Sequence, residues 1–161
     1  VVPTREGSWH DFMNALVWAT YPRAKRALHE RQHRYVTLER SMGRAGKRLP
    51  CHDALAVLDE GGVLVSSALP LEDDAALEDA LARREAIAFV FGHAIFEAIA
   101  IRGPWPLVRA RPLALAQGLR DDSLVRAADE ALAALLADDS AFESPRALPR
   151  ISLARIREMD A

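Results

Sequence analysis

The chain has 161 residues, of which 50% are hydrophobic and 27% charged, and its formal net charge is −2. That length supports one domain with a hydrophobic core, and the composition excludes a disordered polyelectrolyte, a collagen and a coiled coil. The near-neutral charge argues against a protein whose main partner is a nucleic-acid backbone or an anionic membrane. The single cysteine, Cys51, excludes an intramolecular disulfide and a cysteine-rich zinc module, and it predicts a reducing, cytoplasmic location.

The first forty residues are predicted to form two helices. Ser8, followed three residues later by Asp11, is a helix-start signature and predicts a helix through about Thr20. Pro22 can occupy the first turn of a second helix, which runs to about Met42.

A β-hairpin is predicted after these helices, at about residues 54–67. Two short apolar runs, 54–58 and 63–67, are separated by Asp59-Glu60-Gly61-Gly62. Acidic residues and glycines between two apolar runs are typical of a hairpin turn.

The second half of the chain alternates between helices and strands. The expected elements are a helix over 73–85, a strand over 87–91 that breaks at Gly92 into a helix over 93–101, a strand over 107–115 and a helix over 122–137. The tail from residue 140 is expected to be irregular. The chain is therefore predicted to have an α+β fold, with helices packed on a small, mostly antiparallel sheet.

The longest apolar run, Ala86–Ile101, does not predict a membrane anchor. It has 16 residues and is interrupted by Gly92, His93 and Glu97. A helix that spans a bilayer needs about 20 mostly apolar residues. The run is interpreted as a buried strand that leads into a buried helix.

The segment His29-Glu30-Arg31-Gln32-His33 matches the zinc-protease pattern His-Glu-x-x-His. The apolar stripe of its helix includes Ala24 and Leu28, and His29 points about 140° away from that stripe. A catalytic zinc helix would lie in the core, where a charged neighbour such as Arg31 is costly. We interpret the match as coincidental and the two histidines as part of a solvated face.

Polar residues stand among apolar ones in the first helix. His10 and Asn14 are one turn apart, with Asp11 at their flank, while both faces of the helix are apolar in the following turn. A buried polar group without a partner costs about 1–3 kcal/mol, so these side chains need partners. Helix capping is one interpretation of them, and a functional site is the other.

His93 and Glu97 repeat this spacing on a second apolar helix. They can be a satisfied pair in the core, a general base with its orienting carboxylate, or a pair of metal ligands. Asp53 precedes the predicted hairpin, and Asp59 and Glu60 lie in its turn, where acidic residues are commonly structural.

Several motifs of the chain occur in the same order in a known family. They are Val2-Pro3-Thr4-Arg5, Trp9-His10-Asp11-Phe12-x-Asn14-Ala15-Leu16-Val17-Trp18, Pro22-Arg23-x-Lys25-x-x-Leu28, Asp53-Ala54-Leu55-x-x-Leu58-Asp59-Glu60-x-Gly62-Val63 and Phe91-Gly92-His93-Ala94. With them, residues 2 to about 100 resemble an uncharacterised bacterial family named domain of unknown function 3025.

The resemblance implies no known activity, but it indicates which polar residues belong to the shared motifs. These are His10, Asp11, Asn14, Asp53, Asp59, Glu60 and His93. His29 and His33 fall outside the motifs. The resemblance also implies that the chain, taken as a single domain over residues 1–161, is trimmed at both ends relative to the family.

The leading hypothesis is a hydrolase-like enzyme whose site joins the first helix to the helix that begins at His93. His93 or His10 would act as base or metal ligand, and Asn14 would position an unidentified substrate, which is a small molecule or a protein. The orienting or metal-binding carboxylates would be Asp11, Asp53 and Glu97. Two histidines with carboxylates suit a divalent transition metal such as zinc, manganese or iron better than calcium.

Two other functions are compatible with the same residues. In a non-catalytic binding or adaptor module, the buried His, Asp and Asn side chains would form a hydrogen-bond network that fixes the fold. Nucleic-acid binding would need the basic side chains on one face, and these are Arg23, Arg26, Arg44, Lys47 and Arg48. A homodimer is expected if trimmed ends expose an apolar surface.

Overall fold

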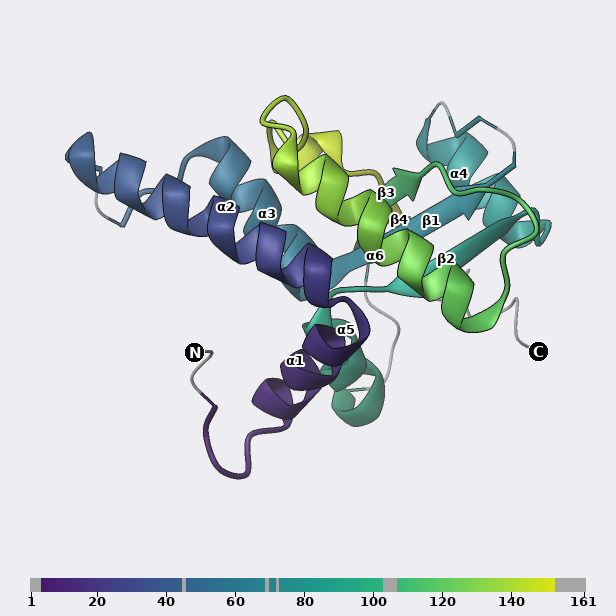
Figure 1. Ribbon diagram of the computed structural model, residues 1–161, viewed down its shortest axis with the longest axis horizontal. Coiled ribbons are helices and arrows are strands. Elements are labelled where there is room, and N and C mark those ends of the chain that lie inside the picture. The colour runs from purple at the N-terminus through teal and green to yellow at the C-terminus, as the bar shows by residue number, and fades with distance from the viewer. Residues whose placement is uncertain (1–3, 45, 69, 72, 103–106, 153–161) are drawn as a thin grey trace.

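The computed structural model describes residues 4–44, 46–68, 70–71, 73–102 and 107–152. Within these ranges helices pack on a four-stranded sheet, so the predicted α+β class is confirmed (Figure 1). The helices are α1 (Trp9–Thr20), α2 (Pro22–Ser41), α3 (Pro50–Gly61), α4 (Asp74–Ala82), α5 (His93–Glu97) with its π-helical continuation η1 (Ala98–Arg102), α6 (Asp121–Ala137) and the 3-10 turn η2 (Pro145–Ala147). The strands are β1 (Gly62–Ser67), β2 (Ala86–Val90), β3 (Leu107–Leu113) and β4 (Arg150–Ser152).

The strands lie in the order β2-β1-β3-β4. The central pair, β1 and β3, is parallel and aligns Val63 with Ala110, whereas β1 with β2 and β3 with β4 are antiparallel. The chain between β1 and β3 forms the long connection that a parallel pair requires, and it contains α4, β2 and α5.

The hairpin predicted at about 54–67 is wrong, because its first half is the helix α3. Pro50 occupies the first turn of α3, and its buried residues Ala54, Leu55 and Leu58 recur at helical spacing. Gly62 ends this helix instead of turning a hairpin, and β1 then pairs with β2 and β3. The predicted irregular tail also contains β4, which pairs with β3.

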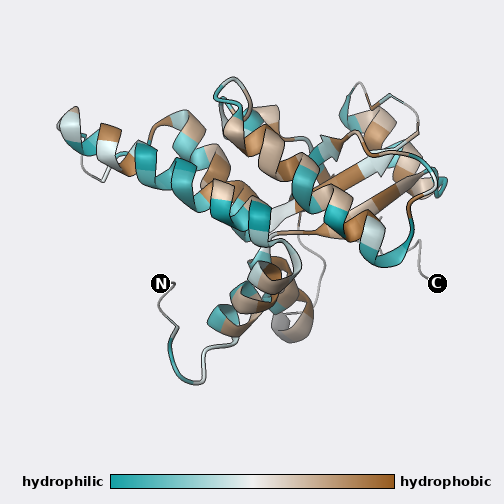
Figure 2. Cartoon of the chain, viewed as in Figure 1, coloured by the Kyte–Doolittle hydropathy of each residue, from teal (hydrophilic) through white to brown (hydrophobic). Residues whose placement is uncertain are grey.

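The hydrophobic core has two parts, one on each face of the sheet. Successive residues of β1 point to opposite faces: Leu64 packs with α2, α3 and α6, whereas Val63 and Val65 pack with α4. Figure 2 shows hydrophobic residues concentrated on the strands and on much of α1 and α5, while the visible side of α2 is more hydrophilic than these elements. On α1, the side chains of Trp9, Phe12 and Leu16 are about half exposed.

Two charged residues join α2 to α6. Arg31, which is buried, donates hydrogen bonds of 2.6–3.2 Å to four carbonyl oxygens at the end of α6 and beyond it, those of Leu136, Asp138, Asp139 and Ala141. Asp129 of α6 accepts hydrogen bonds from the backbone N–H groups of Arg23 and Ala24, at the start of α2. The first N–H groups and the last carbonyl groups of a helix have no partner within that helix. Here α6 accepts from the first N–H groups of α2, and α2 donates to the last carbonyl groups of α6.

None of the helices in the described ranges combines the length and the apolarity needed to cross a bilayer.

Arg31→Met is expected to lower the free energy of unfolding by about 3 kcal/mol or more, because four carbonyl oxygens lose a charged donor. Arg34→Met is the matched control. Arg34 is exposed and also contacts Asp139, so its loss should change the free energy of unfolding by less than about 1 kcal/mol. Urea unfolding followed by circular dichroism measures both values, and equal values for the two variants would contradict the role given to Arg31.

Candidate functional site

The packing of α1 against α5 brings two histidines into contact. The two helices lie together on one side of the molecule (Figure 1). His10 of α1 and His93 of α5 face each other through their Nε2 atoms at 3.0 Å, and their rings meet edge to face with centroids 4.4 Å apart. The site that was predicted to join these two helices therefore has a geometric basis.

Each of these rings turns its other nitrogen, Nδ1, toward a carboxylate. His10 Nδ1 lies 3.2 Å from Glu97 Oε2. His93 Nδ1 lies 3.9 Å from Asp59 Oδ1, which is longer than a hydrogen bond, and it has no hydrogen-bond partner in the described part of the chain. Asp59 therefore faces this nitrogen without a hydrogen bond to it. Histidines that bind metals commonly have this arrangement, because the carboxylate fixes the ring with its other nitrogen free to coordinate.

Glu60 adds a third possible ligand on the Nε2 side. Its Oε2 lies 3.4 Å from His93 Nε2, and ligand atoms of His10, Glu60 and His93 all lie within 4.8 Å of one another. With metal–nitrogen bonds of about 2.1 Å, a separation of 3.0 Å between the two Nε2 atoms corresponds to an angle of about 90° at a shared ion. The three side chains can therefore bind one ion together.

Burial differs across this group of side chains. His93 is only 3% exposed, and this burial lowers its pKa, although Asp59 and Glu60 act in the opposite direction. The neutral imidazole is the form that binds a metal. The side chains of His10 and Glu60 are 35% and 54% exposed, so one side of the group is open to solvent.

Gly92 lets the end of α3 approach the start of α5. A Cβ at this position would lie 2.4 Å from Gly62 N and 2.6 Å from Glu60 O, so any side chain would collide with backbone. Gly62 O accepts hydrogen bonds from the N–H groups of Phe91 and Gly92, at 3.0 and 2.8 Å. The missing side chain therefore allows Glu60 to stand beside His93.

Sequence reasoning missed Lys25, which lies behind the site. Its ammonium is fully buried, lies 2.5 Å from Asp59 Oδ1 and stands over the rings of Phe91 and Trp18. The only signal for Lys25 was its place in the motifs that carry the family resemblance. Asp59 and Glu60 were interpreted as turn residues, but they lie in the last turn of α3 and face the histidines.

The other expected site residues do not all join His10, His93 and Glu97. Asp11 turns away and forms a two-pronged ion pair with Arg5, which holds the pKa of Asp11 well below its usual range. Asp53 is in the first turn of α3, at the opposite end from Glu60, and lies 3.8 Å from Arg48. Asn14 is partly buried one turn beyond His10, and its side-chain oxygen has no partner within the described ranges. The catalytic roles assigned to all six residues stay predictions.

The pattern His29-x-x-x-His33 does not form a metal site in the described structure. His33 is exposed, and His29 packs edge to face on Trp18 with ring centroids 5.0 Å apart. Arg31, between them, points into the core, where the backbone carbonyls described above compensate its charge. The group that could hold a metal in the described residues does not include either histidine.

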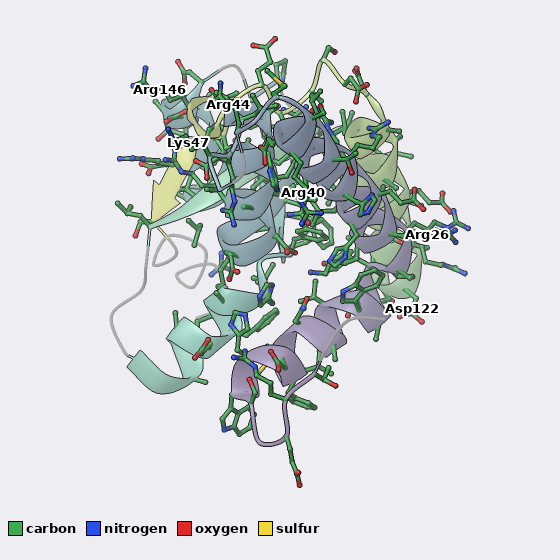
Figure 3. All side chains as sticks on the ribbon, turned by 90° about the vertical axis from the view of Figure 1, so that its left-hand side faces the viewer. Arg26, Arg40, Arg44, Lys47, Asp122 and Arg146 are labelled. Atoms are coloured by element: carbon green, nitrogen blue, oxygen red, sulfur yellow. The ribbon has the colours of Figure 1, made fainter. Side chains whose placement is uncertain are left out.

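The basic residues do not form one continuous face. Arg23 pairs with Glu130, and Arg26 with Glu30. Figure 3 shows Arg26 far from Arg44 and Lys47.

Gly92→Ala is expected to lower the free energy of unfolding by about 2 kcal/mol or more, because the new methyl group must displace backbone at the end of α3. Gly61→Ala is the matched control. A Cβ there meets nothing within 4 Å, and alanine is the better helix former, so this variant should be as stable as the wild type or more stable. Thermal unfolding of the two variants measures the difference. A Gly92→Ala variant as stable as Gly61→Ala would contradict the close contact.

Comparison with known proteins gives a family but no activity. No curated protein matches the chain, and no solved structure matches it. Residues 1–159 match the family described as "Protein of unknown function (DUF3025)". This match extends beyond the motifs of the first hundred residues to almost the whole sequence, and the chain belongs to the DUF3025 family.

Proposed function

We propose that this protein is a metal-dependent, hydrolase-like enzyme that binds a divalent transition metal between His10, His93 and Glu60. One observation carries the proposal. The two histidines turn their Nε2 atoms toward each other at 3.0 Å, while their Nδ1 atoms turn toward Glu97 and Asp59. This orientation leaves the two Nε2 lone pairs, with the Glu60 carboxylate beside them, directed at one point.

The contact between the two Nε2 atoms needs a positive charge or a proton between them. If both rings carry their proton on Nδ1, two lone pairs converge on nitrogens only 3.0 Å apart and repel. In the metal-free protein a proton on Nε2 of His10, donated to Nε2 of His93, relieves this repulsion. A metal ion relieves it as well and gains the carboxylate of Glu60, so metal binding replaces that proton.

The ligand set supports hydrolysis as the chemistry. Two histidines and one carboxylate leave at least one coordination position of a tetrahedral ion for water, as in catalytic zinc sites. A bound zinc ion would lower the pKa of its water to about 7 and so would supply a nucleophile at neutral pH. Glu97 orients the ring of His10, and the negative charge of Asp59 faces Nδ1 of His93. The exposed sides of His10 and Glu60 give a substrate access. Asn14, one turn along α1, is proposed to position that substrate.

Metal analysis is the first test of this proposal. Protein purified without chelator is expected to contain close to one zinc, manganese or iron ion per chain by elemental mass spectrometry. The variant His10→Ala/His93→Ala should lose the metal, because two of its three ligands are gone. His33→Ala is the matched control and should retain it, since His33 is exposed and remote from the ligand set.

A wild type that stays free of metal, even after incubation with these three ions, would contradict the proposal. The same histidines would then belong to a structural network, as in the adaptor hypothesis.

The affinity for zinc is expected to fall by about tenfold or more between pH 7.5 and pH 5.0, because protons compete with the metal for the imidazoles. Burial lowers the pKa of His93, so this imidazole remains neutral further into the acid range than an exposed histidine. The loss should therefore steepen toward the lower end of that interval. Competition with a chromogenic chelator at several pH values measures it, and an affinity independent of pH would exclude histidine ligands.

A further inference from the structure

We propose that Lys25 is a positioning residue for this site, which acts through Asp59 to hold His93 with its proton on Nδ1 and its Nε2 free. The effect of Lys25 on metal binding rests on the proposed function. The effect of Lys25 on the position of the His93 proton is independent of that function, because it can be measured in the metal-free protein.

A single oxygen atom lies between Lys25 and His93. Asp59 Oδ1 lies 2.5 Å from Lys25 Nζ and 3.9 Å from His93 Nδ1. A side chain that accepts the ammonium of Lys25 on this oxygen has its rotation fixed, and the same oxygen is then directed at the imidazole. The ionised carboxylate is negative and can only accept hydrogen bonds, so even from 3.9 Å its charge favours the His93 form that carries its proton on Nδ1.

The surroundings of Lys25 indicate a specific role for its charge. Lys25 is fully buried, although transfer of an ammonium group from water into the interior is costly. Its compensation comes from Asp59 and from the rings of Phe91 and Trp18, whose centroids lie 5.6 and 6.0 Å from Nζ. Lys25 and Phe91 are buried, and Asp59 is 16% exposed. The lysine therefore supports His93, the more buried of the two histidines.

Lys25 also sets the charge of the site. Three carboxylates face the two imidazoles, those of Asp59, Glu60 and Glu97, and Lys25 offsets one of them. Three negative charges and one positive charge leave a charge of −2, which a divalent cation neutralises. Without Lys25, Asp59 would be free to turn away from His93 or to bind the ion itself, and the ligand set would change.

Nitrogen NMR of the histidine rings tests the position of the proton directly. Two-bond ¹H–¹⁵N correlation spectra of the metal-free wild type are expected to show the His93 proton on Nδ1. In Lys25→Met, an apolar replacement of similar length, a substantial fraction of His93 should carry its proton on Nε2. Lys47→Met makes the same change at the chain's other, exposed lysine and should give the wild-type spectrum.

Zinc titration of the same three proteins gives the second measurement. Lys25→Met should bind zinc 10–100-fold more weakly than the wild type, as is typical when a group behind a metal ligand is lost. A folded Lys25→Met variant with wild-type ring spectra would overturn the proposal. A wild type whose His93 proton lies on Nε2 would overturn it as well.

A double variant covers the case in which Lys25→Met does not fold. Lys25→Met/Asp59→Asn removes both charges and leaves no unpaired buried ion. The neutral amide holds the Nδ1 proton less strongly than the carboxylate, so the proton should again distribute over both nitrogens. An unchanged Nδ1 proton in this variant overturns the role of Lys25. A wild type that binds no zinc defeats the proposed function alone, because the ring spectra still decide the inference on Lys25.

Discussion

The lack of a side chain at Gly92 lets three stretches of backbone meet, and both the sheet and the candidate site depend on that contact. The end of α3, the start of β1 and the start of α5 converge there, and Gly62 O accepts two N–H groups from the chain that leaves β2. The first consequence is that β1 can be buried on both faces between its neighbours. The second is that Glu60 and His93, which are 33 positions apart in the sequence, stand side by side.

Charges inside the core, rather than apolar contacts alone, determine how α2 is held. Its two buried cations face in different directions. Arg31 satisfies carbonyl groups at the end of α6, and Lys25 contacts the acidic end of α3. Neither cation is left without compensation, which is the condition under which a charge can remain in an interior. One helix thereby links the packing of the larger core to the electrostatics of the candidate site.

Local signals in the sequence predicted α1, α2 and α6 well, because Ser8, Pro22 and an amphipathic repeat mark these helices directly. The error at 54–67 arose because two glycines after two acidic residues resemble a hairpin turn, although Leu55 and Leu58 already had helical spacing. Pairs one turn apart on apolar helices also identified His10, His93 and Glu97 as residues of interest.

What the sequence could not supply was the long-range partners. Asp59 is 34 residues from Lys25, and the carbonyl of Leu136 is 105 residues from Arg31. The sequence around a helical lysine or arginine does not indicate that the side chain will be buried. Sequence reasoning therefore places such residues on the surface. For Asp11 the partner is local: its carboxylate pairs with Arg5, six positions away. Asp11 is therefore next to a candidate histidine in the sequence but is not part of the site.

The parallel pairing of β1 with β3 has a consequence for the order of folding. Because α5 lies in the connection between these two strands, His93 and Glu97 are carried by a closed loop of the chain, and His10 and Glu60 reach them from helices outside that loop. Closing such a loop costs entropy before its contacts can form. A partly folded chain therefore has the ligands but not their convergence, and an ion that binds only the native arrangement would shift the folding equilibrium toward it. Metal loading in the cell would then act on the lifetime of this protein as well as on its chemistry.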